Sequence, residues 1–248
     1  DGSGLRQITF GPYDDFEPTY LPDGEIIFVS TRCKRWVNCW MTQVATLFRC
    51  DSDGKNIRQV SGNTEHDNTP WVMPDGRILY TRWEYVDRSQ VDFHHLWTMN
   101  PDGSNQAIYY GNTHPGRLMI DAKPIPGTDS VVASFSRGHG RNEHRGPVGI
   151  IHARQGPDAL SAARILKPGL QIQDPYPLSE DCFLVAQDKQ ILVVDGEGNT
   201  DVLFAYDGPG AIHEPRPVMA RMREPVIAPR TDPLSETGEL ILMDAHVG

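Results

Sequence analysis

Acidic residues recur along this chain at nearly constant spacing. Glu17, Asp121, Asp174 and Glu214 stand at corresponding points of similar segments, and Thr69 takes the same place between the first two. Consecutive positions lie 52, 52, 53 and 40 residues apart. If each position starts one copy of a repeated unit, the four carboxylates converge on a common axis.

Converging carboxylates have several chemical uses. As metal ligands, all four would offer oxygen atoms to Ca²⁺ or another divalent cation in an axial channel. As an acid–base set with separated pKa values, the catalytic candidates are Asp121, Asp174, Glu214 and the adjacent His213. A third use is ion pairing with arginines of neighbouring loops, namely Arg32, Arg82, Arg117 and Arg137. A fourth is purely structural, with backbone N–H groups donating to the carboxylates.

The segment RGHGRNEHR (137–145) is the densest in chemically active side chains. Imidazoles can ligate a transition metal, and guanidinium groups can hold a carboxylate or phosphate. The ligand-contacting candidates here are Arg137, His139, Arg141 and His144. Alternatively, the arginines neutralise the acidic residues across the channel. His94 and His95 are weaker candidates, because adjacent residues at a strand start point to opposite sides.

The elements that must position these groups are read from a repeated phrase. Residues 17–30 (EPTYLPDGEIIFVS) and 69–82 (TPWVMPDGRILYTR) share Pro-x-x-x-Pro-Asp-Gly followed by an apolar run. Asp-Gly turns recur in DSDGKNIRQV (51–60) and NPDGSNQAIY (100–109). Pro-Asp-Gly reverses the chain, and the flanking runs favour strands. Each unit therefore predicts four antiparallel strands, the blade of a β-propeller.

Degenerate copies begin at Asp121, Asp174 and Glu214, which gives five units. We expect an all-β chain forming one propeller domain over residues 1–248. LRQITF (5–10) resembles an outer strand and is expected to close the last blade. The alternative is part of a six-bladed propeller. Only 158–166 (DALSAARIL) could hold a short helix.

The predicted strand order sorts the loops between two faces. The tight Asp-Gly turns emerge on one face, and the long 2–3 loops and inter-blade segments emerge on the other. Loops longer than a turn requires are usually binding loops. The long-loop face is therefore the expected functional face, and the four axial carboxylates lie near it.

Composition excludes some function classes. The net charge is −10, which disfavours a nucleic-acid or anionic-membrane surface. No run of 18 apolar residues exists, so no membrane span is expected. The chain starts at Asp1 without a signal peptide, as expected of a mature or trimmed product. Cys33 and Cys39 flank one short loop, which predicts a disulfide in an exported protein; a metal or cofactor attachment is the alternative.

Two resemblances follow from these segments. The Pro-x-x-x-Pro-Asp-Gly phrase resembles the TolB/PD40 class of WD40-like propeller repeats, which specifies a fold and little of the function. The second rests on the ordered segments STRCK (30–34), DGRILYTRWEYVDR (75–88), LWTMNPDGSN (96–105), FSRGHGRNEHRGPVGII (135–151), DPYPLSEDCFLVA (174–186) and EPRPV (214–218). This set is similar to the middle, propeller-type domain of the hydrazine synthase alpha subunit family.

That resemblance implies a fragment of a large exported multidomain protein with c-type haem modules. Cys33, His139 and His144 would then approach a haem carried by a neighbouring domain or subunit, because this chain has no CxxCH motif. If the protein is an enzyme, the resemblance implies an oxidoreductase. The alternatives are a carbohydrate-active hydrolase or lyase with axial carboxylates, and a TolB-like protein-interaction module.

Overall fold

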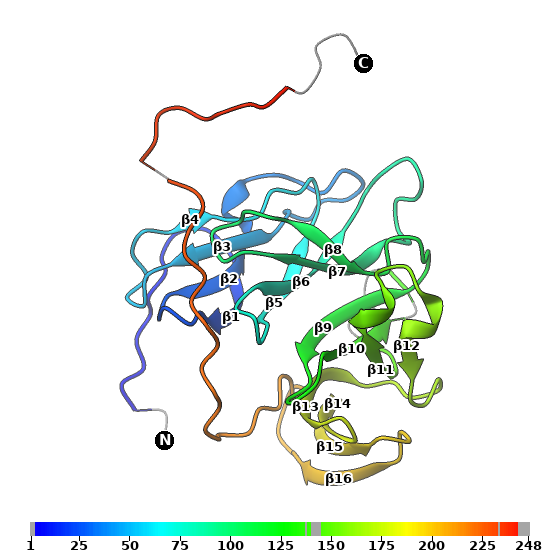
Figure 1. Cartoon of the computed structure of the whole chain (residues 1–248). Coiled ribbons are helices and arrows are strands. Elements are labelled where there is room, and N and C mark those ends of the chain that lie inside the picture. The colour runs from blue at the N-terminus through cyan, green and yellow to red at the C-terminus, as the bar shows by residue number, and fades with distance from the viewer. Residues whose placement is uncertain (1–2, 137, 140–144, 233, 243–248) are drawn as a thin grey trace.

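The computed structural model describes residues 3–136, 138–139, 145–232 and 234–242. It contains four sheets, each of four antiparallel strands in chain order, arranged around a common axis (Figure 1). We call the sheets blades 1 to 4. Blade 1 holds β1 (Asp15–Tyr20), β2 (Ile26–Ser30), β3 (Thr46–Cys50) and β4 (Arg58–Gln59). Blade 2 holds β5 (Asp67–Val72), β6 (Ile78–Trp83), β7 (His94–Met99) and β8 (Ala107–Tyr110). Blade 3 holds β9 (Leu118–Pro124), β10 (Ser130–Ser136), β11 (Val148–His152) and β12 (Ala163–Ile165). Blade 4 holds β13 (Gln173–Ser179), β14 (Cys182–Gln187), β15 (Gln190–Asp195) and β16 (Thr200–Ala205).

The predicted all-β propeller fold is confirmed. The Pro-Asp-Gly turns join the first two strands of blades 1 and 2, where Gly24 and Gly76 have φ of 93° and 86°. A residue with a side chain is strained at such a φ, which explains the glycine. Among the residues described, helix is confined to short 3₁₀ segments, η1 (Thr31–Cys33), η2 (Ala153–Gln155) and η3 (Leu160–Ala162). The segment proposed as a helix thus forms η3 and then β12.

Consecutive blades pack face to face through apolar side chains. Ile27 and Leu47 of blade 1 pack against Ile78 and Tyr80 of blade 2, and all four are fully buried. Similar clusters join blade 2 to blade 3 and blade 3 to blade 4. Because each sheet is covered by the next, the core is distributed between the blades, as in other repeat architectures.

Each inner strand carries a β-bulge at its unit start. Glu17, Thr69, Asp121 and Asp174 have φ between 50° and 58°, and the register of β1, β5, β9 and β13 with the next strand shifts at these residues. A bulge turns the strand and re-aims a side chain. Here it turns the same repeat position toward the axis in every blade.

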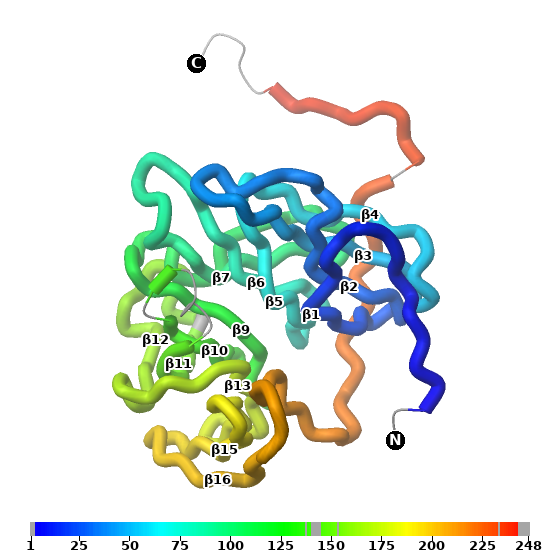
Figure 2. Tube along the Cα trace, turned by 180° about the vertical axis from the view of Figure 1, so that it is seen from behind, coloured from blue at the N-terminus to red at the C-terminus, as the bar shows by residue number. Residues whose placement is uncertain are grey.

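The predicted fifth blade is not formed. In the described part of the chain, residues 206–242 contain no strand, and LRQITF (5–10) also lies outside the sheets. Figure 2 shows the arc of blades with blade 1 at one end and blade 4 at the other, and the C-terminal segment running past blade 1. Pro225 and Pro229 offer no N–H to a ladder, whereas Pro215 has counterparts in the strands that form, at Pro18, Pro70 and Pro175.

Two smaller expectations were also tested. Cys33 and Cys39 are free, so the predicted disulfide is absent. The Cys33 thiol instead donates a hydrogen bond to the carbonyl oxygen of Val44 at 3.1 Å. Among the described residues, no helix is long and apolar enough to cross a membrane.

Candidate functional site

The unit-start residues are linked by hydrogen bonds around the axis. The backbone N–H of Thr69 donates to Oε2 of Glu17 at 2.6 Å, and that of Asp121 donates to Oγ1 of Thr69 at 3.3 Å. Further round, the N–H of Glu214 donates to Oδ2 of Asp174 at 3.0 Å. At these three junctions, the side chain of one unit start binds the backbone of the next. This is the structural use of the carboxylates that the sequence left as one alternative.

Three of the four predicted metal ligands come together at the axis. Asp121, Asp174 and Glu214 each place one carboxylate oxygen within 4.8 Å of the others. Asp121 and Asp174 are buried, while Glu214 is half-buried. We call these three residues the axial cluster. Glu17 lines the same small cavity but stands outside the group of three.

The axial cluster has its own cations, which sequence reasoning missed. Lys123 is buried, with its Nζ 3.9 Å from Oε2 of Glu214 and 3.4 Å from the carbonyl oxygen of Asp121. Arg216 donates to Oε2 of Glu214 at 2.6 Å. Both cations also lie over the Trp71 ring, at 5.4 Å for Lys123 and 4.9 Å for Arg216. These contacts offset part of the negative charge that four carboxylates would otherwise accumulate.

His213 completes this group of residues. Its Nδ1 lies 3.3 Å from Oδ2 of Asp174 and 2.7 Å from Nε2 of Gln173. Burial raises the pKa of the Asp174 carboxyl above its ordinary value, and the nearby Asp121 carboxylate raises it further. The four catalytic candidates therefore do lie together.

The free space beside the axial cluster is very small. The cavity lined by Glu17, Asp121 and Glu214 has a volume of about 10 Å³. This is close to the least volume that holds one water molecule, and a sugar ring is many times larger. The geometry therefore does not favour a carbohydrate substrate at the axial carboxylates.

Two of the four arginines expected to reach the axial carboxylates, Arg32 and Arg82, bind elsewhere. Arg32 pairs with Asp15 at 2.7 Å, and Arg82 pairs with Asp67 at 2.8 Å. Both partners stand two residues before a unit start, so each arginine ties the beginning of β1 or β5 to the next strand. For these two arginines the expectation was wrong, because the nearer acidic partner lies on the same blade, whereas Arg137 lies outside the described residues.

The long-loop face is organised around Trp83, at the end of β6. The Trp83 ring stacks on His94, with centroids 5.3 Å apart and an interplanar angle of 13°. This stack follows from strand register, because Trp83 and His94 are paired across β6 and β7. His139, from the loop after β10, lies 4.5 Å from the Trp83 ring, and its Nδ1 is 3.0 Å from Nε2 of His94. His94 is buried and His139 is exposed.

The loop that follows η1 also packs against Trp83. Cys33, Val37 and Val44 pack with Trp83 in one apolar cluster, together with Tyr85. His66, in the segment between blades 1 and 2, lies 5.7 Å from the same ring. Loops from blades 1, 2 and 3 therefore converge on one side chain. We call Trp83, His94, His139 and Cys33 the Trp83 cluster.

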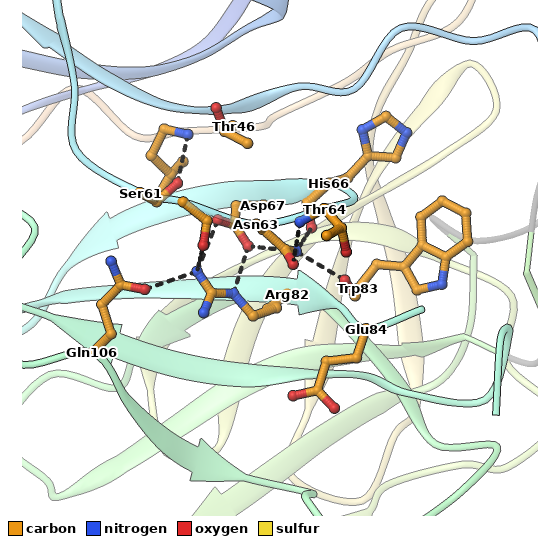
Figure 3. A network of polar contacts seen from close by, with 12 residues as sticks. Thr46, Ser61, Asn63, Thr64, His66, Asp67, Arg82, Trp83, Glu84 and Gln106 are labelled. Atoms are coloured by element: carbon orange, nitrogen blue, oxygen red, sulfur yellow. Dashed lines mark hydrogen bonds and ion pairs between the residues drawn. The ribbon is translucent and has the colours of Figure 1, made fainter. Parts of the chain in front are cut away.

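A buried polar network holds the backbone of Trp83 in place (Figure 3). Arg82 donates to both carboxylate oxygens of Asp67, at 2.8 and 3.0 Å, and to Oε1 of Gln106 at 3.0 Å. Asn63 Nδ2 donates to the carbonyl oxygen of Trp83 at 2.9 Å and to Oδ1 of Asp67 at 3.2 Å. The backbone of Trp83 is thus held by side chains that are themselves fixed in place.

Glu84, the residue after Trp83, contacts a different set of side chains. Its Oε2 accepts from Arg88 at 2.6 Å, and its Oε1 lies 3.4 Å from Nε2 of the buried His95. The His95 hydrogen bond and the Arg88 guanidinium together lower the pKa of Glu84 to about 2. As strand alternation predicts, His94 and His95 contact different groups.

The loop of blade 1 presents large apolar side chains to solvent. Trp36 is exposed, and the exposed fractions of Trp40 and Met41 are 75% and 88%. Val86 and Val91, in the adjacent loop of blade 2, are also exposed. Exposed apolar side chains gathered on packed loops are typical of an interaction site.

Of the predicted cofactor-binding residues, the structure brings Cys33 and His139 together at Trp83. Arg137, Arg141 and His144 lie outside the described residues. Arg145, at the end of the same loop, pairs with Asp188 at 2.8 Å. The signal for Trp83 was present in the sequence, since a tryptophan ended the strand RILYTRW just before a long loop.

Comparisons with known proteins support the fold. No family model matches the sequence, and no curated protein matches it. Among solved structures, the chain is similar to hydrazine synthase of Kuenenia stuttgartiensis, with a TM-score of 0.66 and 20% identity over 84% of this chain and 34% of that one. It is also similar to TolB of Acinetobacter baumannii, with a TM-score of 0.58 and 14% identity over 86% and 48%. A puromycin hydrolase has a TM-score of 0.51 and 15% identity over 84% and 31%.

These likenesses establish a β-propeller fold and leave the function open, because one fold supports many activities. The chain spans about a third to a half of the length of these structures.

Proposed function

We propose that this chain is a propeller module whose long-loop face docks a neighbouring domain or subunit of a larger exported protein. This proposal rests on the convergence of three loops on Trp83. Their packing orders the long-loop face before any partner binds, and it leaves the side chains of Trp40 and Met41 exposed. Rigid aromatic anchors on a preorganised surface are typical of protein interfaces.

The finer proposal concerns the nature of that neighbour. The sequence resemblance to the hydrazine synthase alpha family, together with the similarity to the Kuenenia structure, favours a c-type haem domain. The side chains of this face suit contact with a haem edge, because they include indole, thioether and imidazole groups in Trp40, Met41 and His139. The haem would supply electron transfer, and its covalent attachment would lie outside this chain, which lacks CxxCH.

A role for the axial cluster is the second candidate. Three carboxylate oxygens within 4.8 Å would suit a divalent cation such as Ca²⁺. Lys123 competes with such an ion, because its ammonium group already lies 3.9 Å from Glu214. The cation site therefore stays a prediction, and the docking function is favoured.

The docking proposal is tested by titrating the chain with a soluble haem c peptide and following the Soret band. We expect His139→Ala to weaken binding by about tenfold, equivalent to 1.4 kcal/mol. His152→Ala is the matched control, because His152 ends β11 on the opposite, turn-bearing face. Equal affinity of both variants and the unmodified chain would remove the haem-contact role, and a titration with no binding would do the same.

A further inference from the structure

A groove lies on the turn-bearing side of the molecule, away from the long-loop face. It has a volume of about 440 Å³, and one of its walls is formed by the ends of β1 and β5, next to the Pro-Asp-Gly turns. Most side chains of this wall are apolar or aromatic, among them Tyr20, Trp71 and Val72. We call the cavity the Trp71 groove. Its volume is typical of small-molecule sites.

The other wall belongs to residues 214–231, which we call the crossing segment. Its first residue is held at the axis by a backbone hydrogen bond. The segment then passes so close to the turn of blade 2 that a side chain on Gly76 would collide with the carbonyl oxygen of Pro225. At its end, the N–H of Thr231 donates to Oδ2 of Asp102 at 3.1 Å. The wall is therefore fixed at both ends and between them, so the groove is preformed.

Two arginines of the crossing segment lie over the Trp71 ring. The Cζ atoms of Arg216 and Arg221 are 4.9 and 5.5 Å from the ring centroid. Arg216 is neutralised, because it donates to Oε2 of Glu214 at 2.6 Å. Among the described residues, Arg221 has no carboxylate partner. The groove therefore offers one guanidinium group whose charge is not compensated.

Glu224 offers a charge of the opposite sign. It lines the same groove and is half-buried. Within the part of the chain that the structure describes, its carboxylate neither pairs with Arg221 nor accepts a hydrogen bond. A ligand with a single charge would satisfy one of these two groups and leave the other desolvated, which costs free energy. A ligand that carries both an ammonium and a carboxylate group satisfies both.

We propose that the Trp71 groove binds a short peptide of two or three residues with an apolar side chain. The peptide carboxylate would pair with Arg221 and the peptide ammonium with Glu224, as in other sites that capture chain termini. The apolar side chain would pack on Tyr20, which is 73% exposed, and on Val72. A free amino acid suits the groove less well. Its two charges are closer by about one residue length, about 3.5 Å, than those of a dipeptide, whereas Arg221 and Glu224 are too far apart to pair.

Calorimetric titration of the full chain with the dipeptide leucyl-phenylalanine tests the site. We expect binding that weakens by at least about tenfold when the peptide carboxylate is amidated, and likewise when its amino group is acetylated, since each change removes one charge-assisted pair. Free phenylalanine should bind more weakly than the dipeptide. The proposal would be overturned by no detectable binding of the dipeptide, by equal affinity of the three peptides, or by tighter binding of free phenylalanine.

Two variants of the crossing segment locate the carboxylate. Arg221→Gln should weaken the free dipeptide by about tenfold and leave the affinity for the amidated peptide unchanged, because both changes remove the same pair. Arg223→Gln is the matched control, since Arg223 is exposed on the same segment but does not line the groove. Neither exposed change should alter the melting temperature. Equal weakening by the two variants, or a further loss for the amidated peptide in Arg221→Gln, would show that the ligand does not pair with Arg221.

Discussion

The backbone N–H of Glu214 donates a hydrogen bond to the carboxylate of Asp174, 40 residues earlier in the chain, at 3.0 Å. Glu17 and Thr69 are linked in the same sense, 52 residues apart. This relationship explains why acidic or hydroxyl side chains recur at the unit starts. Glu17, Thr69 and Asp174 each accept from the backbone N–H of the next unit start, which its bulge turns toward the axis.

Asp174→Asn should stabilise the fold at neutral pH. Burial raises the pKa of Asp174 above 3.8, so its ionised form is disfavoured in the folded state, and asparagine keeps an oxygen for the Glu214 N–H. The gain is about 1.4 kcal/mol for each unit by which the pKa is raised. It should be full above the folded-state pKa and vanish as the pH falls below 3.8. Urea unfolding across this pH range measures it; a gain that persists at low pH would contradict the explanation.

Lys123→Met should destabilise the protein by about 1 to 3 kcal/mol, because it removes the buried ammonium group from beside the axial cluster and leaves Arg216 as the cation on Glu214. It should also make the melting temperature respond to Ca²⁺, since an ion that binds only the folded state stabilises it by mass action. Thermal melts with Ca²⁺ and with a chelator check both points. We expect little response in the unmodified chain. A clear rise there with Ca²⁺, reversed by the chelator, would show that the axial cluster holds a cation despite Lys123.

Glu84→Gln should remove an acid-sensitive part of the stability. The pKa of Glu84 is lowered from 4.5 to about 2, chiefly by its hydrogen bond with His95. A lowered folded-state pKa contributes stability above pH 4.5 that is lost as the pH falls toward 2. The variant should therefore unfold with a flatter pH dependence in this window. Glu236→Gln, at an exposed position, is the control; identical slopes in the two variants would argue against the role of Glu84.

His94 and His139 should differ in their effects on stability. His139→Ala, at an exposed loop position, should cost about 0.5 kcal/mol or less. Trp83→Ala should cost about 3 to 5 kcal/mol, because the ring is buried among three loops. His94→Ala should lie between these values. Chemical denaturation of the three variants checks this order. A large loss of unfolding free energy in His139→Ala would mean that this loop stabilises the fold rather than forming part of a binding face.

The blades, and the convergence of the unit-start residues on one axis, could be predicted because short repeated sequence motifs specify both. Asp-Gly turns and apolar runs specify the hairpins, and the spacing of Glu17, Asp121 and Asp174 specifies the axis. The partners of the carboxylates could not be predicted, since Lys123 and the N–H of Thr69 reach them only after the bulges form. The fifth unit misled the prediction because its start, Glu214, takes the same bulged conformation as the other unit starts, whereas the described residues of 206–242 form no strand.

The most direct test of the docking function is hydroxyl-radical footprinting of Trp40 and Met41. The oxidation rates should be compared between this chain and the protein encoded by its complete gene. We predict that both residues, exposed at 75% and 88% here, become several-fold less reactive in the complete protein. Tyr20, which is 73% exposed at the end of β1 beside the Pro-Asp-Gly turn, should keep its rate. Unchanged reactivity of Trp40 and Met41 would contradict the claim that the long-loop face is a docking surface.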